Sequence, residues 1–162
     1  MAAVEQMAFR DAMAQFPSGV TVVTARTASG TLAGFTASAF SSLSLDPPLV
    51  LVCLDKKADS HTAFEDVEQF AISFLAEGQD DVAMRFATRG IDKFGGFRST
   101  NGALTGLPLV PDALVHLECR VHERLPGGDH TIIIGEVLSA QTYAKAPLLH
   151  HNRRFGAFHT ST

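Results

Sequence analysis

The strongest constraint on the fold of this chain is the stretch of residues 34–54. Between Phe35 and Leu45 apolar and hydroxyl-bearing side chains alternate, which predicts a β-strand with two different faces. One face would carry Phe35, Ala37, Ala39, Ser41, Leu43 and Leu45, and the other Thr36, Ser38, Phe40, Ser42 and Ser44. Asp46-Pro47-Pro48 ends this strand because proline has no amide hydrogen to donate. The apolar run of residues 49–54 then predicts a second strand, buried on both faces.

The first of these strands is unusually poor in bulky side chains. Alanine and serine fill a half-buried surface badly, so the strand gains little from side-chain packing. Its backbone amides and hydroxyls can instead approach a flat ligand with a polar edge. A tightly packed barrel corner is the alternative interpretation of the same residues.

Composition restricts the kind of protein. A chain of 162 residues with 46% hydrophobic content predicts one domain over residues 1–162, with its core at about residues 9–158. The net charge of −4 argues against a nucleic-acid partner. Neither Cys53 nor Cys119 has metal-like spacing, and a reducing, cytoplasmic setting is expected. The sequence shows no signal peptide and no apolar run of the ~20 residues that cross a membrane.

Periodicity predicts many strands and few helices. Residues 4–16 read as a helix that buries Phe9, Ala12, Met13 and Phe16 as one stripe. Residues 80–88 read as another helix, and strands are expected at residues 20–25, 69–75, 114–122 and 130–138. Hairpin turns are expected at Ser29-Gly30 and at residues 126–129. In the strand over residues 114–122, His116, Glu118, Arg120 and His122 should face water or a partner. The pattern favours an antiparallel β-barrel or sandwich with peripheral helices.

Residues 55–65 offer a candidate anion site. Asp59 or Ser60 can cap a short helix, and Thr62 with Glu65 has capping-box spacing. Lys56 and Lys57 stand just before it, where free amides favour an anionic group. A solvated loop is the alternative. Further along, Phe86 and Phe94 can either wall a ligand site or belong to the core.

The sequence gives little support for several other kinds of functional site. His116, Glu118 and His122 share a strand face and His150 adjoins His151, but a solvated polar face explains them better than a metal site. No Gly-x-Ser-x-Gly, Gly-x-Gly-x-x-Gly or P-loop motif is present. His130 differs from the other histidines because it follows a Gly-Gly-Asp turn, where its side chain can project into a cleft.

Three motifs carry a family resemblance. Residues 34–40 (GFTASAF), 46–50 (DPPLV) and 128–130 (GDH), the last leading into residues 135–137 (GEV), resemble the short-chain flavin reductase family. The likeness is to the reductase components of two-component flavin-dependent monooxygenases and extends from about Phe9 to Phe158. It implies a mainly β fold, an antiparallel Greek-key split β-barrel with peripheral α-helices, which is usually a homodimer.

The resemblance also implies a reaction and its residues. The activity would be an NAD(P)H:flavin oxidoreductase, with hydride passing from NADH to FAD or FMN by stacking and the reduced flavin released to a monooxygenase. NADH is favoured because no arginine cluster for a 2′-phosphate is apparent. A non-catalytic flavin- or haem-binding split barrel is the alternative. The implied flavin contacts are Thr36, Ala37, Ser38, Ser42, Leu43, Cys53, Leu54, Asp55, Ser60, His61, Thr62, Phe86 and Phe94. The implied nicotinamide contacts are His130, Arg153 and Phe155, the last at a position where Tyr is common.

Overall fold

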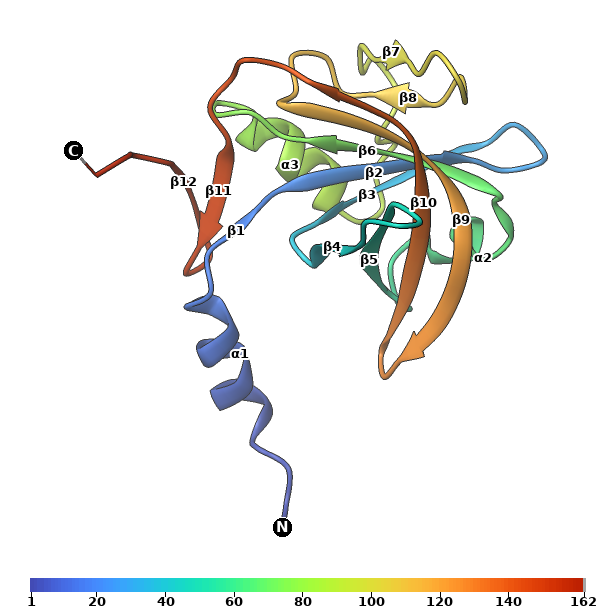
Figure 1. Ribbon diagram of the computed structural model, residues 1–162. Helices are drawn as coiled ribbons and strands as arrows, with labels where there is room; N and C mark the ends of the chain where they lie inside the picture. The colour runs from blue at the N-terminus through green and yellow to red at the C-terminus, as the bar shows by residue number, and fades with distance from the viewer. Residues whose placement is uncertain (162) are drawn as a thin grey trace.

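A seven-stranded antiparallel sheet forms the body of the protein, in the strand order β3-β2-β6-β9-β10-β5-β4 (Figure 1). The computed structural model describes residues 1–161. The helices are α1 (Gln6–Ala14), α2 (His61–Asp66) and α3 (Asp80–Ala87). The strands are β1 (Ser18–Gly19), β2 (Thr21–Arg26), β3 (Leu32–Ala37), β4 (Phe40–Ser44), β5 (Leu49–Asp55), β6 (Gln69–Phe74), β7 (Thr100–Asn101), β8 (Pro108–Leu109), β9 (Val115–Gly127), β10 (His130–Thr142), β11 (Leu148–His151) and β12 (Arg154–Ala157). The mainly β, antiparallel prediction is confirmed.

The single strand predicted for residues 35–45 is wrong, because the chain breaks it into β3 and β4. These two strands lie at opposite ends of the strand order, and residues 38–39 carry the chain from one edge of the sheet to the other. The N–H of Cys53 donates to the carbonyl oxygen of Ala39 at 3.0 Å, so the two edges approach each other there. Alternation therefore stops at Ala37, and Leu43 and Leu45 are exposed rather than on a buried face.

Strand β5 is buried on one face only. Val50, Val52 and Leu54 lie in the core, whereas Leu49, Leu51 and Cys53 keep part of their surface in contact with solvent. The prediction of burial on both faces was wrong. An unbroken apolar run cannot tell whether a second layer covers the outer face, and within the described chain none does.

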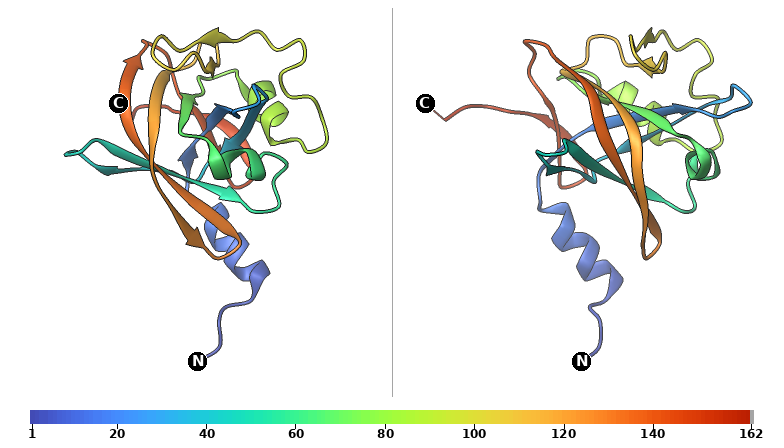
Figure 2. Two further views of the ribbon diagram at one scale, coloured as in Figure 1. Left: turned by 90° about the vertical axis from the view of Figure 1, so that its right-hand side faces the viewer. Right: turned by 45° about the vertical axis from the view of Figure 1, so that its right-hand side comes forward.

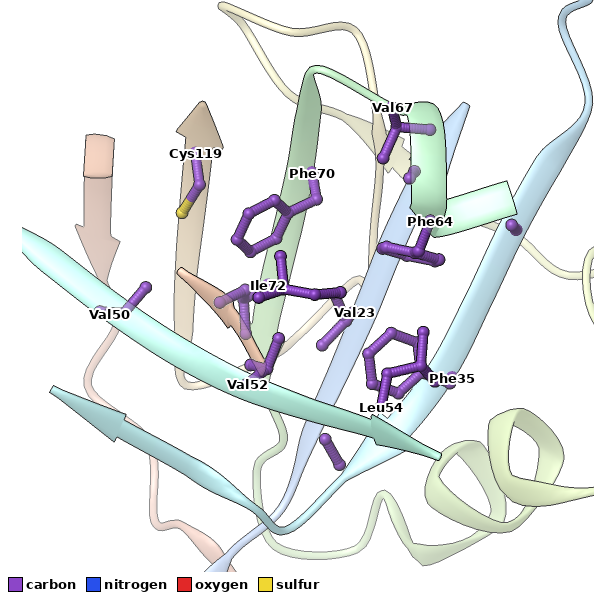
Figure 3. Packing of buried hydrophobic residues seen from close by; sticks show 14 of the residues in the cluster. Val23, Phe35, Val50, Val52, Leu54, Phe64, Val67, Phe70, Ile72 and Cys119 are labelled. Carbon is purple, nitrogen blue, oxygen red and sulfur yellow. The ribbon is translucent and has the colours of Figure 1, made fainter. Parts of the chain in front are cut away.

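The core lies on the inner face of the curved sheet (Figure 3). Aromatic and β-branched residues from β2, β3, β5 and β6 meet there, and α2 adds Phe64, whose ring packs edge-on against Phe35 with 5.1 Å between centroids. A second cluster forms where α3 packs on the other side of β2 and β3, around the fully buried Phe86.

Helix α1 contradicts its predicted burial. It begins and ends close to the predicted bounds, but it extends away from the sheet (Figures 1 and 2). Phe9, Met13 and Phe16 are 53%, 54% and 76% exposed, so the apolar stripe exists without a partner inside the described chain. Asp11 pairs with Arg153 at 2.6 Å, and the N–H of Asn152 donates to Ala14 at 2.8 Å, which attaches the helix to the turn between β11 and β12.

The predicted polar face of β9 is also partly wrong. His116 and Glu118 are buried because the segment before β9 covers them. The Glu118 carboxylate accepts hydrogen bonds from Leu104 and Thr105, and His116 Nε2 bonds the carbonyl oxygen of Val110 at 2.7 Å. Burial and the adjacent Glu118 charge raise the pKa of the Cys119 thiol to about 12. A strand pattern shows which residues share a face, but not which loop lies over it.

The remaining elements follow the sequence closely. The hairpin β2–β3 turns at residues 27–31, and the long hairpin β9–β10 turns at Gly128 and Asp129, as predicted. No helix in residues 1–161 is long and apolar enough to cross a membrane.

Gly135 on β10 permits the closest contact in the core and yields a stability prediction. A Cβ atom at Gly135 would lie 2.4 Å from Phe70 Cζ and 3.1 Å from Cys119 Cβ. We expect Gly135→Ala to lower the free energy of unfolding by about 1–3 kcal/mol through overpacking. Thermal and urea denaturation would measure this loss.

Gly156→Ala is the matched control, because a Cβ atom there meets nothing within 4 Å. Phe70→Leu should restore part of the stability of Gly135→Ala, since it removes the atoms that clash. If Gly135→Ala were as harmless as Gly156→Ala, the contact would not be a packing constraint.

Candidate functional site

A hollow of about 260 Å³ opens beside the end of β3, and we call it the first hollow. Residues 35–39 form one side and residues 53–55 with Ala58 and Asp59 another, while α3 and the loop after it close the third. It brings together eight of the residues predicted from the sequence: Thr36, Ala37, Ser38, Cys53, Leu54, Asp55, Phe86 and His130.

Close packing of α3 on β3 forms the wall of this hollow. At Gly34 a Cβ atom would lie 2.9 Å from Phe86 Cε1 and 3.1 Å from the carbonyl oxygen of Val23, so only glycine allows the approach. The Thr36 hydroxyl donates to the carbonyl oxygen of Ala83 at 2.6 Å. Phe86 is therefore both a core residue and a wall of the hollow. Small residues here serve packing as well as access, while Ser38 and Ala39 remain exposed.

Several charged side chains surround the first hollow. Arg89 pairs with Asp55 at 3.4 Å, and His130 Nδ1 lies 2.8 Å from an oxygen of Asp129. The hydrogen bond from His130, together with its charge when protonated, lowers the pKa of the Asp129 carboxyl. Lys93 extends across β3 and donates to the carbonyl oxygen of Gly34 at 3.1 Å. Burial lowers the pKa of the Lys93 ammonium and raises the pKa of the Cys53 thiol.

A second hollow of about 230 Å³ lies beside the beginning of β3. Residues 31–34 of the β2–β3 hairpin, Ser60 and Ala63 at α2, and the loop of residues 91–94 line it. Asp59 and Lys93 line both hollows. The predicted residues Ser60 and Phe94 therefore belong to this second hollow rather than the first.

Ser60 precedes α2 but does not cap it. Its side chain makes no cap hydrogen bond, and its buried Oγ has no hydrogen-bond partner within residues 1–161. The Thr62–Glu65 capping box was wrong as well, because Ser60, not Thr62, precedes the first turn. A buried hydroxyl without a partner is uncommon and calls for an explanation.

Six of the predicted residues lie outside both hollows. His61 bonds Thr131 through Nε2 at 2.9 Å, and the exposed Thr62 faces the turn of the β2–β3 hairpin. Ser42 and Leu43 are exposed on β4. Arg153 pairs with Asp11 on α1, and Phe155 packs beside His150 with 5.5 Å between ring centroids. Within one chain the two hollows do not reach these residues.

Sequence reasoning missed Ala39, Asp59, Arg89 and Lys93. From the sequence, neither Arg89 nor Lys93 was singled out as a ligand contact. The signal for Lys93 was weak, because nothing in the local sequence shows that its loop folds back over β3. Within residues 1–161 no three His, Cys, Asp or Glu side chains are arranged to hold a metal ion.

The chain matches a family of known proteins over most of its length. A family model described as "Flavin reductase like domain" matches residues 13–159. The NADH:riboflavin 5′-phosphate oxidoreductase of Streptomyces pristinaespiralis is 45% identical to the chain, over 99% of this chain and 90% of that protein. A reductase component of 4-nitrophenol 4-monooxygenase/4-nitrocatechol 2-monooxygenase from Rhodococcus opacus is 41% identical, over 96% of this chain and 82% of that protein.

A solved structure matches over nearly the whole length. It is an NADH:FAD oxidoreductase of Streptomyces globisporus in complex with NAD and FAD fragments, with a TM-score of 0.90 and 38% identity, and it covers 98% of both chains. The chain belongs to the flavin reductase-like family. The predicted resemblance is confirmed.

Ala39 allows a test that separates ligand access from packing. Ala39 is exposed and lines the first hollow, whereas the side chain of Ala37 is buried in the core. We expect Ala39→Phe to abolish flavin binding with an unchanged melting temperature. Ala37→Phe should instead cost about 1–3 kcal/mol of stability through overpacking. Calorimetric titration with flavin and thermal denaturation measure the two effects.

Ala144→Phe, at another exposed alanine, is the control for a bulky aromatic side chain on the surface. Flavin affinity that is the same in Ala39→Phe as in Ala144→Phe would show that the ligand does not use this side of the first hollow.

Proposed function

We propose that this protein is an NADH-dependent flavin reductase that transfers hydride from NADH to FAD or FMN and releases the reduced flavin to a separate monooxygenase. The observation that carries the proposal is the first hollow, which brings His130 together with residues 35–39, of which Ser38 and Ala39 are exposed. Relatives described as an NADH:riboflavin 5′-phosphate oxidoreductase and a monooxygenase reductase component support it. We also propose that residues 1–162 form a single domain with the Greek-key split-barrel arrangement.

The residues of the two hollows fit a flavin. Ser38 and Ala39 offer a low, exposed surface on which a flat ring can lie close to the backbone. Lys93 and Arg89 supply positive charge next to it, and the buried Ser60 hydroxyl offers a hydrogen bond that no described residue uses. A flavin bound there would supply the hydride acceptor. The protein's own task is then to bind and orient the two partners.

Catalysis of this kind depends on position rather than on an acid or base. The Thr36 hydroxyl already donates to the carbonyl oxygen of Ala83, so it fixes the wall and has no proton free for a ligand. His130 lies at the mouth of the first hollow, paired with Asp129, and we assign it to the nicotinamide side. The roles of Arg153 and Phe155 in nicotinamide binding remain predictions, since neither lines the first hollow.

The site favours release of the flavin over permanent retention. Arg89 is well exposed, and its ion pair with Asp55 is accessible to water. Solvent and salt screen such contacts, so each contributes little to affinity. A non-catalytic flavin- or haem-binding protein is the alternative function, and turnover separates the two.

We further propose that the protein is a homodimer. The stripe of Phe9, Ala12, Met13 and Phe16 on α1 has no partner within the described chain, and a second copy of the chain would bury it. A neighbouring hollow of about 500 Å³ runs from Phe16 to Ser38 and Ala39. Because Ser38 and Ala39 also line the first hollow, the proposed interface would adjoin the active site.

A turnover assay tests the proposed reaction. After dialysis we expect NADH oxidation to depend saturably on added FAD or FMN, and cytochrome c to trap reduced flavin in solution. Replacing His130 with Ala should raise KM for NADH several-fold, while the Kd for oxidised flavin stays close to the original. Binding of flavin without any oxidation of NADH would favour the non-catalytic alternative. Full activity without added flavin, and no reduced flavin after ultrafiltration, would refute release.

Light scattering tests the dimer. We expect a particle of about twice the chain mass, and Phe9→Glu should shift it toward the monomer because a charge at a buried apolar contact is costly. Met84→Glu, on the exposed face of α3, is the control. A monomer that turns over flavin would show that the site is complete within one chain.

A further inference from the structure

The first and second hollows adjoin along β3, because Asp59 and Lys93 line both of them, and we call the pair the groove. Residues 31–34 line the second hollow and residues 35–39 line the first, so the pair follows the chain for about 25 Å at the rise of an extended strand. The loop before α2 forms one wall, and α3 with the loop after it forms the other. Asp59 and Lys93 therefore mark the junction of the two hollows. A ligand with two ends and a linker would fit this shape better than a single ring.

The two ends of the groove differ in chemistry. Apolar side chains dominate the second hollow, where Leu32, Ala63, Ile91 and Phe94 lie. Its charged residues are Asp59, Asp92 and Lys93, so carboxylates outnumber cations there. A terminal phosphate with two negative charges would be repelled by this composition. A flat heterocycle that donates hydrogen bonds through an amino group is favoured, because the apolar walls can cover its faces and Asp59 can accept from it.

The junction suits a diphosphate linker. Lys93 Nζ is held at 3.1 Å from the carbonyl oxygen of Gly34, partly buried and with its pKa lowered by that burial. A phosphate at this point would replace a neutral acceptor with a charged one and form a stronger hydrogen bond. Ser60 lines the second hollow and follows Asp59 in the chain, and its buried Oγ has no hydrogen-bond partner among the residues of the described chain. Its hydroxyl can donate to the same linker.

We propose that the second hollow is an adenosine subsite and that this chain therefore binds FAD in preference to FMN, with Lys93 and Ser60 holding the diphosphate. This proposal rests on the proposed flavin reductase function. The isoalloxazine ring then lies in the first hollow, and Ile91 and the other residues of the second hollow determine the preference for FAD over FMN.

Equilibrium binding tests the proposal without turnover. Calorimetric titration with FAD, FMN and riboflavin, with NADH absent, should give a Kd for FAD at least about tenfold lower than that for FMN. If FMN binds as tightly as FAD, the adenosine subsite is refuted while the reductase function stands. If none of the three flavins is reduced by NADH, the proposed function fails, whatever their relative affinities.

Two variants locate the subsite. Ile91 is exposed, so Ile91→Ala should not disturb folding, and we expect it to raise the Kd for FAD about five- to tenfold relative to that for FMN. Met84→Ala, an equally exposed apolar truncation outside both hollows, should leave the ratio unchanged. If Ile91→Ala left the ratio of the Kd for FAD to the Kd for FMN unchanged, or raised KM for NADH instead, the assignment of the second hollow as the adenosine subsite would be overturned.

Lys93→Met tests the linker. We expect the Kd to rise for both phosphorylated flavins, FAD and FMN, and to move least for riboflavin, which carries no phosphate. In the original protein, affinity for FAD should fall as pH rises through the lowered pKa of Lys93, because the ammonium then loses its charge. An equal loss for all three flavins would mean that Lys93 supports the loop rather than the phosphates.

Discussion

The close contact between α3 and β3 determines the shape of the site. Glycine at position 34 lets the ring of Phe86 lie against the strand, and Phe94 and Phe97 then pack edge-on against that ring at 5.3 and 5.2 Å. Arg85, from the last turn of α3, donates to the carbonyl oxygens of Lys93 and Gly95. One helix thus fixes both a wall of the first hollow and the loop that carries Lys93 over the strand. A residue larger than glycine at position 34 would displace all of these together.

This arrangement explains why the family's chemistry requires so few reactive side chains. Hydride transfer needs two rings held at close range, and a rigid, shallow surface provides that without a nucleophile or a strong base. The polar side chains of the wall are consequently used for structure: Thr36 bonds α3, and Arg85 bonds the following loop. The groups that we propose for ligands are the backbone, Ser38, Ser60, the partly buried Lys93, Arg89 and His130.

Sequence alone predicted what depends on neighbouring residues in the chain. The hairpins β2–β3 and β9–β10, strand β6 and helix α3 follow from periodicity and turn residues, and eight of the predicted site residues do meet in the first hollow. The sequence could not predict which surfaces are covered by segments that are distant in the chain. Alternation predicted the correct faces of β9 but not the loop that buries Glu118. The apolar stripe on α1 is present, although nothing in residues 1–161 covers it. Lys93 was missed for the same reason, since only the fold of its loop brings it to β3.

The partial burial of Lys93 fits the proposed role of a protein that binds flavin and then releases it. A fully exposed ammonium would be screened by water and salt and would discriminate poorly between phosphorylated and unphosphorylated ligands. A fully buried one would either lose its charge or hold a phosphate too tightly for exchange. Its hydrogen bond to Gly34 keeps the ammonium at the groove when no ligand is bound, so binding exchanges one acceptor for another and does not leave a cation without a partner. The site can therefore prefer phosphorylated flavins without binding them strongly. A reduced flavin that carries hydride to a second protein by diffusion requires such weak binding.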